Sequence, residues 1–305
     1  MPDAAAPKAG SPAQSKNFAL AAAVVTLSFA LPLWKLFRFA LPDEFYSYIP
    51  LMPFVCGYLV WTRGSQDREK ANSHGLTLSR SLSLVFGLAG IAALAGYFLI
   101  SPKQPLENQL ALSTLSWLLF LTGAGCWLLG GARMRALAFP FFLLIFMVPL
   151  PAGLRDGIES ALQHGSATVA DWMFTLTGTP LLREGTFFQL PGMSLQVAPE
   201  CSGIHSTWIL LITSLVAANV ILRRPWKRAV LCLAVIPLAL LRNGFRVFVI
   251  GELCVHAGPQ MIHSPIHRHG GPVFFVLSLM PLFLLLYFLR KNEQSSAATA
   301  QTINK

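Results

Sequence analysis

Eight apolar segments, each close to the length that crosses a bilayer, dominate this sequence. A membrane-spanning helix needs about 20 mostly apolar residues. Hydrophobic residues make up 54% of the chain and charged residues only 12%, about half the charged share of a soluble domain. The sequence therefore predicts an all-α polytopic membrane protein. Its eight expected spans are residues 17–34, 45–62, 81–100, 110–130, 136–150, 204–222, 229–250 and 272–289.

Polar segments bound the expected membrane domain at both ends. Residues 1–16, rich in Ala and Pro, are expected to form a disordered cytoplasmic tail. Residues 17–290 would be the transmembrane domain, and residues 291–305 a second cytoplasmic tail. The first apolar run is long and lacks a convincing cleavage site, so it is expected to be an uncleaved helix.

The basic residues predict how the chain is oriented in the membrane. With the N-terminus inside, the inner segments hold fifteen Lys and Arg residues and the outer segments six. Lys and Arg concentrate in cytoplasmic loops, and "RRPWKR" at 223–228 is the clearest such anchor. Both termini are therefore expected in the cytoplasm. The net charge of +10 does not indicate nucleic-acid binding, since no basic helix or aromatic platform accompanies it.

Residues 151–203 are the one substantial segment expected outside the cytoplasm. A stripe of residues at helical spacing predicts an amphipathic helix on the outer membrane face or across the mouth of the bundle. The segment "TFFQLPGMSLQV" alternates around a Pro-Gly pair and predicts a short β-hairpin before the sixth span. The stripe consists of Leu154, Ile158, Leu162, Gly165, Val169, Trp172, Met173 and Leu176.

Three chemically reactive side chains are expected at one membrane depth on the outer side. Cys201 begins the sixth span, Arg246 lies near the outer end of the seventh, and His267 precedes the eighth. A thiolate is a nucleophile whose pKa falls near cations and helix N-termini. An imidazole can take the thiol proton and return it to a leaving amine, and a guanidinium can stabilise an oxyanion. The set predicts acyl transfer through a thioester, a reaction that requires no cofactor and no metal.

Other interpretations of these residues stay open. Glu200, Ser202 and Gly203 could shape the turn into the sixth span, with Asn243 as a further supporting residue, and His205 competes as general base. Arg242 lies one turn from Arg246, so one of the two could be structural and paired with Glu252 or Glu200. Cys201 and Cys254 could form a disulfide. Metal ligation is a possible role for His256, His263, His267 and His269.

At these residues the chain resembles a known family. "APECSGIHST", "RNGFRV" and "HRHGGPVFF", in this order on successive spans, are similar to motifs of the exosortase and archaeosortase membrane transpeptidases. Further similarity lies in "FYSYIPLMPFVCGYLVWTR", in "FFLLIFMVPLPAGL" and in "GTFFQLPGMSLQVAPECSGI", so the resemblance covers roughly residues 44–290.

The resemblance implies a multi-pass enzyme of a bacterial or archaeal cytoplasmic membrane with its active site on the outer face. Its partners would be exported proteins that end in a sorting signal of the PEP-CTERM type, namely a short motif, a transmembrane helix and a basic tail. The enzyme would pass them to an unknown acceptor nucleophile, often in organisms that make exopolysaccharide, and membrane lipids would be further partners. The family's Cys, Arg and His match Cys201, Arg246 and His267.

Two alternatives of another class remain. A transporter or a protein that handles lipid-linked glycans would place polar groups at mid-depth on several spans. A haem- or metal-binding subunit would need paired histidines on facing spans, whereas the histidines here lie mostly between spans.

Overall fold

The computed structural model describes residues 12–64, 76–99, 103–191, 193–197, 202–258, 260–261 and 265–303. Within these ranges, only the backbone is described for residues 12–13, 63–64, 76–79, 265–270 and 295–303. The chain forms two compact units, Met1–Leu154 and Arg155–Lys305, and each is treated by itself.

The first unit is built of helices. Two hydrogen bonds show how closely α4 (Leu76–Leu99) and α5 (Leu106–Leu129) pack. Ser83 Oγ donates to Gly123 O at 2.9 Å, and Ser116 Oγ donates to Gly90 O at 2.9 Å. Small residues at such contacts let two backbones approach. The elements are α1 (Pro12–Ser28), α2 (Ala30–Ala40), η1 (Ile49–Leu51), α3 (Met52–Gly64), α4 (Leu76–Leu99), α5 (Leu106–Leu129), α6 (Gly131–Ala136), α7 (Ala138–Leu143) and η3 (Leu144–Met147).

Several expected boundaries in the first unit differ from the structure. Helix α1 begins at Pro12, inside the segment expected to be a disordered tail, and α1 and α2 meet at a bend of 70°. The segment expected as one span at 136–150 is divided among short helices. It ends where Val148 turns extended before Pro149, because a residue that precedes proline is disfavoured in the helical conformation.

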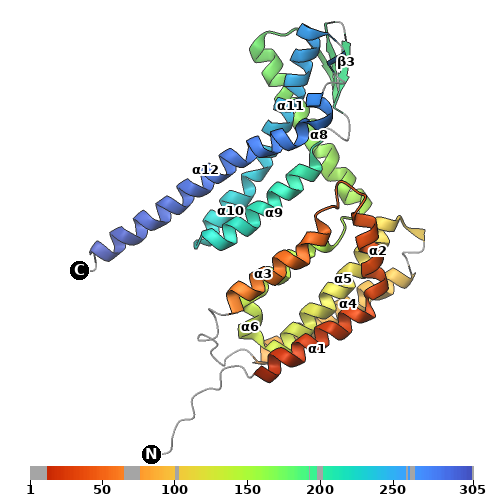
Figure 1. Ribbon diagram of the computed structural model, residues 1–305, viewed down its shortest axis with the longest axis vertical. Helices are drawn as coiled ribbons and strands as arrows, with labels where there is room; N and C mark the ends of the chain where they lie inside the picture. Colours follow the sequence, from red (N-terminus) through yellow and green to blue (C-terminus); the bar gives the residue numbers. More distant parts are fainter. Residues whose placement is uncertain are drawn as a thin grey trace, which may run out of the picture. The chain divides into compact units, whose positions relative to one another are not determined.

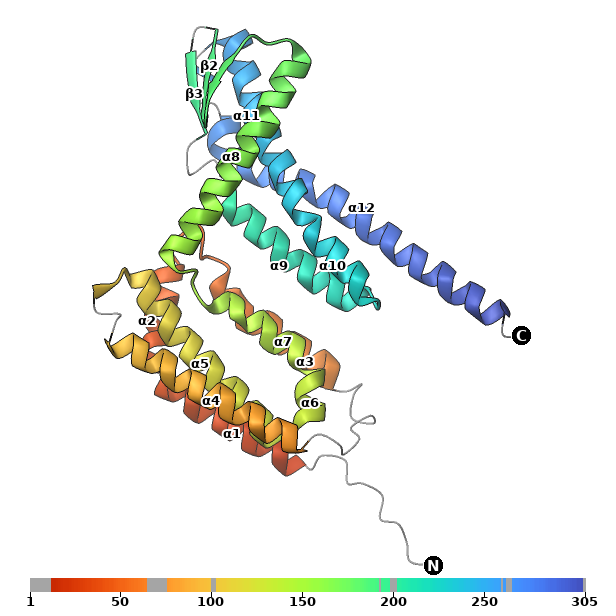
Figure 2. The ribbon, with the colours of Figure 1, turned by 180° about the vertical axis from the view of Figure 1, so that it is seen from behind.

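The second unit combines four long helices with a small sheet. Figures 1 and 2 show the strands beside α8 and α11, and α9 beside α10. The elements are α8 (Ala152–Thr177, whose first three residues belong to the first unit), β1 (Leu182–Glu184), β2 (Phe187–Leu190), β3 (Met193–Gln196), α9 (Ile204–Ile221), α10 (Pro225–Leu233), α11 (Val235–Ala257) and α12 (Pro265–Ile303).

The sheet is antiparallel with the strand order β1-β2-β3. Strands β2 and β3 lie in the segment expected to form a hairpin and pair Phe187 with Gln196 and Leu190 with Met193. Strand β1 is an addition that the alternation around the Pro-Gly pair did not indicate. The turn between β1 and β2 contains Gly185 at φ +64°, a conformation that glycine adopts without steric cost.

The helices support a polytopic membrane protein with fewer clear spans than the eight expected. Within the described residues, five helices are long and apolar enough to cross a membrane, or up to seven if each of two bent pairs is one span. The expected span 45–62 corresponds to the shorter apolar helix Ile49–Thr62. A helix of that length covers less than the hydrocarbon thickness of a typical bilayer.

Helix α8 confirms the helix expected in this part of the chain, and its expected stripe is partly buried. Trp172 and Leu176 of the stripe are 65% and 85% exposed. Gly165 and Val169, also in the stripe, lie close to α11, because a Cβ added to Gly244 would lie 2.5 Å from Val169 Cγ1 and one added to Gly165 would lie 2.7 Å from Leu240 Cδ2. Small side chains allow this approach. The buried residues of α8 are Leu162, Ser166, Ala167, Ala170 and Phe174.

Candidate active site

The turn that precedes α9 is the centre of the candidate site. Ser202 is 1% exposed, and its Oγ accepts a hydrogen bond from the backbone N–H of Ile204 at 3.3 Å. The carbonyl oxygen of Gly203 accepts bonds from the backbone N–H and the Oγ1 of Thr207, at 2.9 and 2.8 Å. These bonds satisfy groups that a helix N-terminus otherwise leaves open, and they define where α9 begins.

Glycine is required at position 203 for two separate reasons. Its backbone is left-handed, with φ +66° and ψ 22°, a conformation that costs an L-residue with a side chain roughly 1–2 kcal/mol. A Cβ at this position would also overlap the side-chain amide of Asn243. The Ser202–Gly203 pair is therefore a turn against which α11 packs without any intervening side chain.

Helix α11 holds this turn through two consecutive residues. Asn243 Nδ2 donates a short hydrogen bond to the carbonyl oxygen of Ser202. Arg242 Nη2 donates to the carbonyl oxygen of Gly203 at 3.2 Å and to Thr207 Oγ1 at 3.2 Å. The guanidinium also donates to Asn243 Oδ1, from Nε at 3.1 Å and from Nη2 at 3.0 Å. A buried polar network of this kind specifies one arrangement of its members.

Arg242 is buried, which sequence reasoning left open for either arginine of α11. Arg242 is only 7% exposed. Within the described part of the chain, none of its hydrogen-bond partners is an acidic group. Glu252, one suggested partner, instead accepts a hydrogen bond from Thr179 Oγ1 at 2.5 Å and lies 3.1 Å from His256 Nε2. Carbonyl and hydroxyl oxygens therefore hold the Arg242 cation.

The end of strand β3, which leads toward the site, also packs on α8 and α11. Val197, which follows β3, is 1% exposed and belongs to one apolar cluster with Val247 of α11 and Phe174 of α8. Its carbonyl oxygen accepts a bond from Gln163 Nε2 at 3.4 Å. Ser202 is therefore hydrogen-bonded to Asn243 of α11, and Val197 lies in the same apolar cluster as Val247 of α11.

Two polar residues of α8 contact this region, and sequence reasoning missed both. Ser202 Oγ donates to Glu159 Oε1 at 3.3 Å, and Gln163 contacts Val197 as described above. The two residues are four apart and share one helix face. Their spacing on one helix face was the available signal, but it does not indicate which residues the face contacts.

The expected catalytic residues are described to different degrees. Cys201 and Glu200 lie outside the described residues, as do the side chains of His267 and His269 and all of His263. The backbone at His267 belongs to the first turn of α12. His205 is the second residue of α9 and is partly buried. Of the expected set, the structure brings Ser202, Gly203 and Asn243 into direct contact.

Arg246 lies one helical turn after Arg242 on α11 and is partly buried. The two guanidinium groups are close enough to repel each other electrostatically. Arginine stays charged in proteins and offers planar donors that match carbonyl and oxyanion geometry. The Arg242 cation is bonded to the Ser202–Gly203 turn, and a neighbouring cation favours anionic species such as a thiolate.

The suggested metal site and the suggested disulfide fall largely outside the described residues. Among the residues described, no group of three or more His, Cys, Asp or Glu side chains could hold a metal ion. Cys254 is buried in α11 at 3% exposure, and its suggested disulfide partner, Cys201, is outside the described residues. The donor set that the structure describes does not build a metal centre.

Comparison with known proteins gives one result. The family model of the transmembrane exosortases matches residues 34–284. No curated protein and no solved structure shows significant similarity to the chain. The matched range covers most of the sequence and contains the Ser202–Gly203 turn, both arginines of α11 and the start of α12. The chain therefore belongs to the transmembrane exosortase family.

Proposed function

We propose that this chain is a cysteine transpeptidase of the bacterial cytoplasmic membrane that processes exported proteins. Its substrates would end in a short motif, an apolar helix and a basic tail, the PEP-CTERM type of signal implied by the family. The active site would face the outer side, with both termini in the cytoplasm. On this orientation the bond to be cut lies at the membrane surface, beside the substrate's own helix.

One structural observation carries the proposal. The Ser202–Gly203 turn is hydrogen-bonded to Arg242 and Asn243 of α11, one helical turn before Arg246, and Val197 belongs to the same apolar cluster as Val247. Cys201 is the residue directly before Ser202 in the sequence, which supports a nucleophile next to this turn. Helices α9, α11 and α12 also pack on one another, which supports a role for His267, at the start of α12, in the same site.

The proposed reaction proceeds in two acyl-transfer steps. His267 takes the proton of the Cys201 thiol, and the sulfur attacks the carbonyl carbon of the scissile peptide bond. Arg246 stabilises the oxyanion of the tetrahedral intermediate. The C–N bond then breaks, His267 returns the proton to the leaving amine, and a thioester remains on Cys201. An acceptor nucleophile attacks the thioester, its proton returns through His267 to the thiol, and the acylated product leaves.

Arg242 and Asn243 act as positioning residues in this scheme. They hold the carbonyl oxygens of Gly203 and Ser202 respectively. A preorganised site of this kind places donors before the charge develops. Glu159, through Ser202, supports the same turn from α8.

The decisive experiment is capture of the thioester. The chain is produced together with an exported protein that carries the tripartite signal, and the mixture is acid-quenched and separated by mass. An adduct on Cys201 that hydroxylamine releases is expected, because thioesters are cleaved by this reagent and peptide bonds are not. The proposal would be contradicted if wild type cleaves the substrate without forming any adduct and Cys201→Ala cleaves it equally well.

A further inference from the structure

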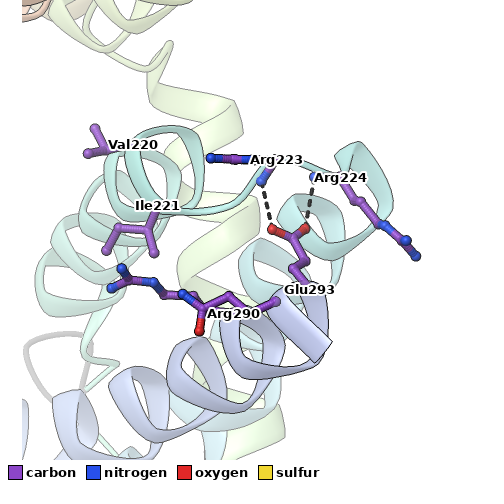
Figure 3. A pocket seen from close by; sticks show the side chains of 7 residues that line it. Val220, Ile221, Arg223, Arg224, Arg290 and Glu293 are labelled. Carbon is purple, nitrogen blue, oxygen red and sulfur yellow. Dashed lines mark hydrogen bonds between the residues drawn. The ribbon is translucent and has the colours of Figure 1, made fainter. Parts of the chain in front are cut away.

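A basic pocket lies at the end of the second unit where α9 passes into α10. It has a volume of about 510 Å³, within the range of roughly 300–1,000 Å³ that is usual for small-molecule sites. Figure 3 shows the residues that line it, which come from the end of α9, the connection to α10 and the later part of α12. They are Val220, Ile221, Arg223, Arg224, Arg290, Glu293 and Gln294.

The acidic residue of the pocket is already engaged by the backbone. Glu293 Oε2 accepts the N–H of Arg223 at 3.1 Å, and Oε1 accepts the N–H of Arg224 at 2.9 Å. Lys227 is also within electrostatic range of this carboxylate, and its Nζ donates to the carbonyl oxygen of Leu289 at 2.8 Å. Glu293 therefore holds the α9–α10 connection against α12. Within the described residues, it accepts no hydrogen bond from an arginine guanidinium.

The arginine side chains remain available to a ligand. Arg223, Arg224 and Arg290 are all exposed. In Figure 3 the side chains of Arg223 and Arg290 extend to the same side as Val220 and Ile221, whereas that of Arg224 extends to the opposite side. Two guanidinium groups and an apolar rim therefore line one side of the pocket.

The pocket lies at the level where a membrane helix meets water. The candidate spans Ile204–Ile221 and Gly271–Gln294 both end at it. Val220 is 62% exposed and Trp226, the second residue of α10, is 54% exposed. Tryptophan is enriched at membrane–water interfaces. The distribution of Lys and Arg predicts that this is the cytoplasmic interface.

We infer that this pocket binds the phosphate headgroup of an anionic phospholipid. Guanidinium groups bind phosphate oxygens through paired hydrogen bonds, and basic pockets between membrane helices on the cytoplasmic side are a recurrent site for anionic headgroups. The apolar rim at Val220 and Ile221 fits the first part of an acyl chain. The inference needs neither Cys201 nor a sorting signal, so it goes beyond the proposed function.

Native mass spectrometry of the purified full-length chain tests this site. Phosphatidylglycerol is titrated onto the protein, with phosphatidylethanolamine and inorganic phosphate in separate arms. Wild type is expected to retain one phosphatidylglycerol in preference to the zwitterionic lipid. The double variant Arg223→Gln/Arg290→Gln should bind it about 25-fold more weakly, at about fivefold per arginine removed near the membrane surface.

Arg135→Gln is the matched control, since Arg135 is an exposed arginine of α6, expected on the same membrane side, and it does not line the pocket. This variant should bind like wild type. Should the double variant be unstable, Arg290→Gln alone is expected to show the fivefold loss. Unchanged binding in the pocket variants, an equal loss in Arg135→Gln, or retention of inorganic phosphate in place of lipid would each overturn the inference.

Discussion

The side-chain amide of Asn243 donates a hydrogen bond to the carbonyl oxygen of Ser202, and this bond joins α11 to the turn that follows Cys201. The bond is made possible by Gly203, where any Cβ would overlap Asn243. Arg242 completes the attachment through the carbonyl oxygen of Gly203. An expected nucleophile is in this way tied to the helix that carries an expected oxyanion donor, Arg246.

Replacing Gly203 with alanine should abolish processing and lower the melting temperature. The left-handed backbone alone costs a residue with a side chain roughly 1–2 kcal/mol, and the Cβ would displace Asn243. Gly157→Ala is the control, because Gly157 lies in α8 and nothing is within 4 Å of its added Cβ; alanine there should be neutral or stabilising. Equal behaviour of the two variants would contradict this account of the turn.

The two arginines of α11 should respond differently to lysine. Arg242→Lys removes a planar set of donors from a buried network, where a hydrogen bond to a charged group contributes about 1.5–3 kcal/mol. It should lower the melting temperature and change the rate at which maleimide labels Cys201. Arg246→Lys should abolish processing with little change in melting temperature, because a point charge lacks the planar fork.

Melting curves, labelling rates and cleavage of a co-produced substrate separate these two outcomes. Arg246→Gln serves as a second variant that removes the charge altogether. If Arg246→Lys keeps full activity while Arg242→Lys loses activity without loss of stability, the proposed roles of the two residues are reversed.

Glu159 should act through its oxygen and not through its charge. Ser202 Oγ donates to Glu159 Oε1 at 3.3 Å, and a glutamine keeps a carbonyl oxygen at that place. Glu159→Gln should therefore process substrate as wild type does. Glu159→Ala should be several-fold slower, consistent with about 0.5–1.5 kcal/mol for one hydrogen bond. A glutamine variant as slow as the alanine variant would point to the carboxylate charge instead.

The two cysteines near the ends of spans should differ sharply. Cys201→Ala should stop processing while the protein still inserts into the membrane. Cys254→Ala should be close to silent in a cleavage assay, since Cys254 is a buried side chain of α11 and a small residue can replace it at modest cost. Equal loss of activity in both variants, together with a mass shift of 2 Da on reduction (approximately that of two hydrogen atoms), would instead favour a disulfide.

Close packing of α8 on α11 should make Gly244 intolerant of a methyl group. A Cβ there would lie 2.5 Å from Val169 Cγ1 and 3.0 Å from the carbonyl oxygen of Ser166. Gly244→Ala should destabilise the protein by about 1–3 kcal/mol, measured by thermal unfolding in detergent. Gly153→Ala, in the open first turn of α8, is the control. Val169→Ala should not restore the stability of Gly244→Ala, because it keeps Val169 Cβ, which lies 2.6 Å from the added Cβ; full restoration would show that the contact with Cγ1 alone is responsible.

The linear pattern determined the class of the protein and the position of its reactive motif. Apolar runs of bilayer length indicate membrane helices without any knowledge of their packing, because the hydrocarbon core imposes length and polarity on each span separately. Three short motifs on successive spans were sufficient to recognise the family, which the match of the family model over residues 34–284 confirms.

Tertiary structure decided which faces and which polar groups meet. The apolar stripe of α8 did not indicate which of its residues pack inside the protein: Leu162 is buried and Trp172 is exposed, and the buried residues also include Ser166 and Ala170, because small residues allow close packing of helices. The roles of Arg242 and Glu159 depend on bonds to residues 39 and 43 positions away in the chain. Such pairings are set by how helices pack, and periodicity along one helix carries no information about the polar group that another helix brings to it.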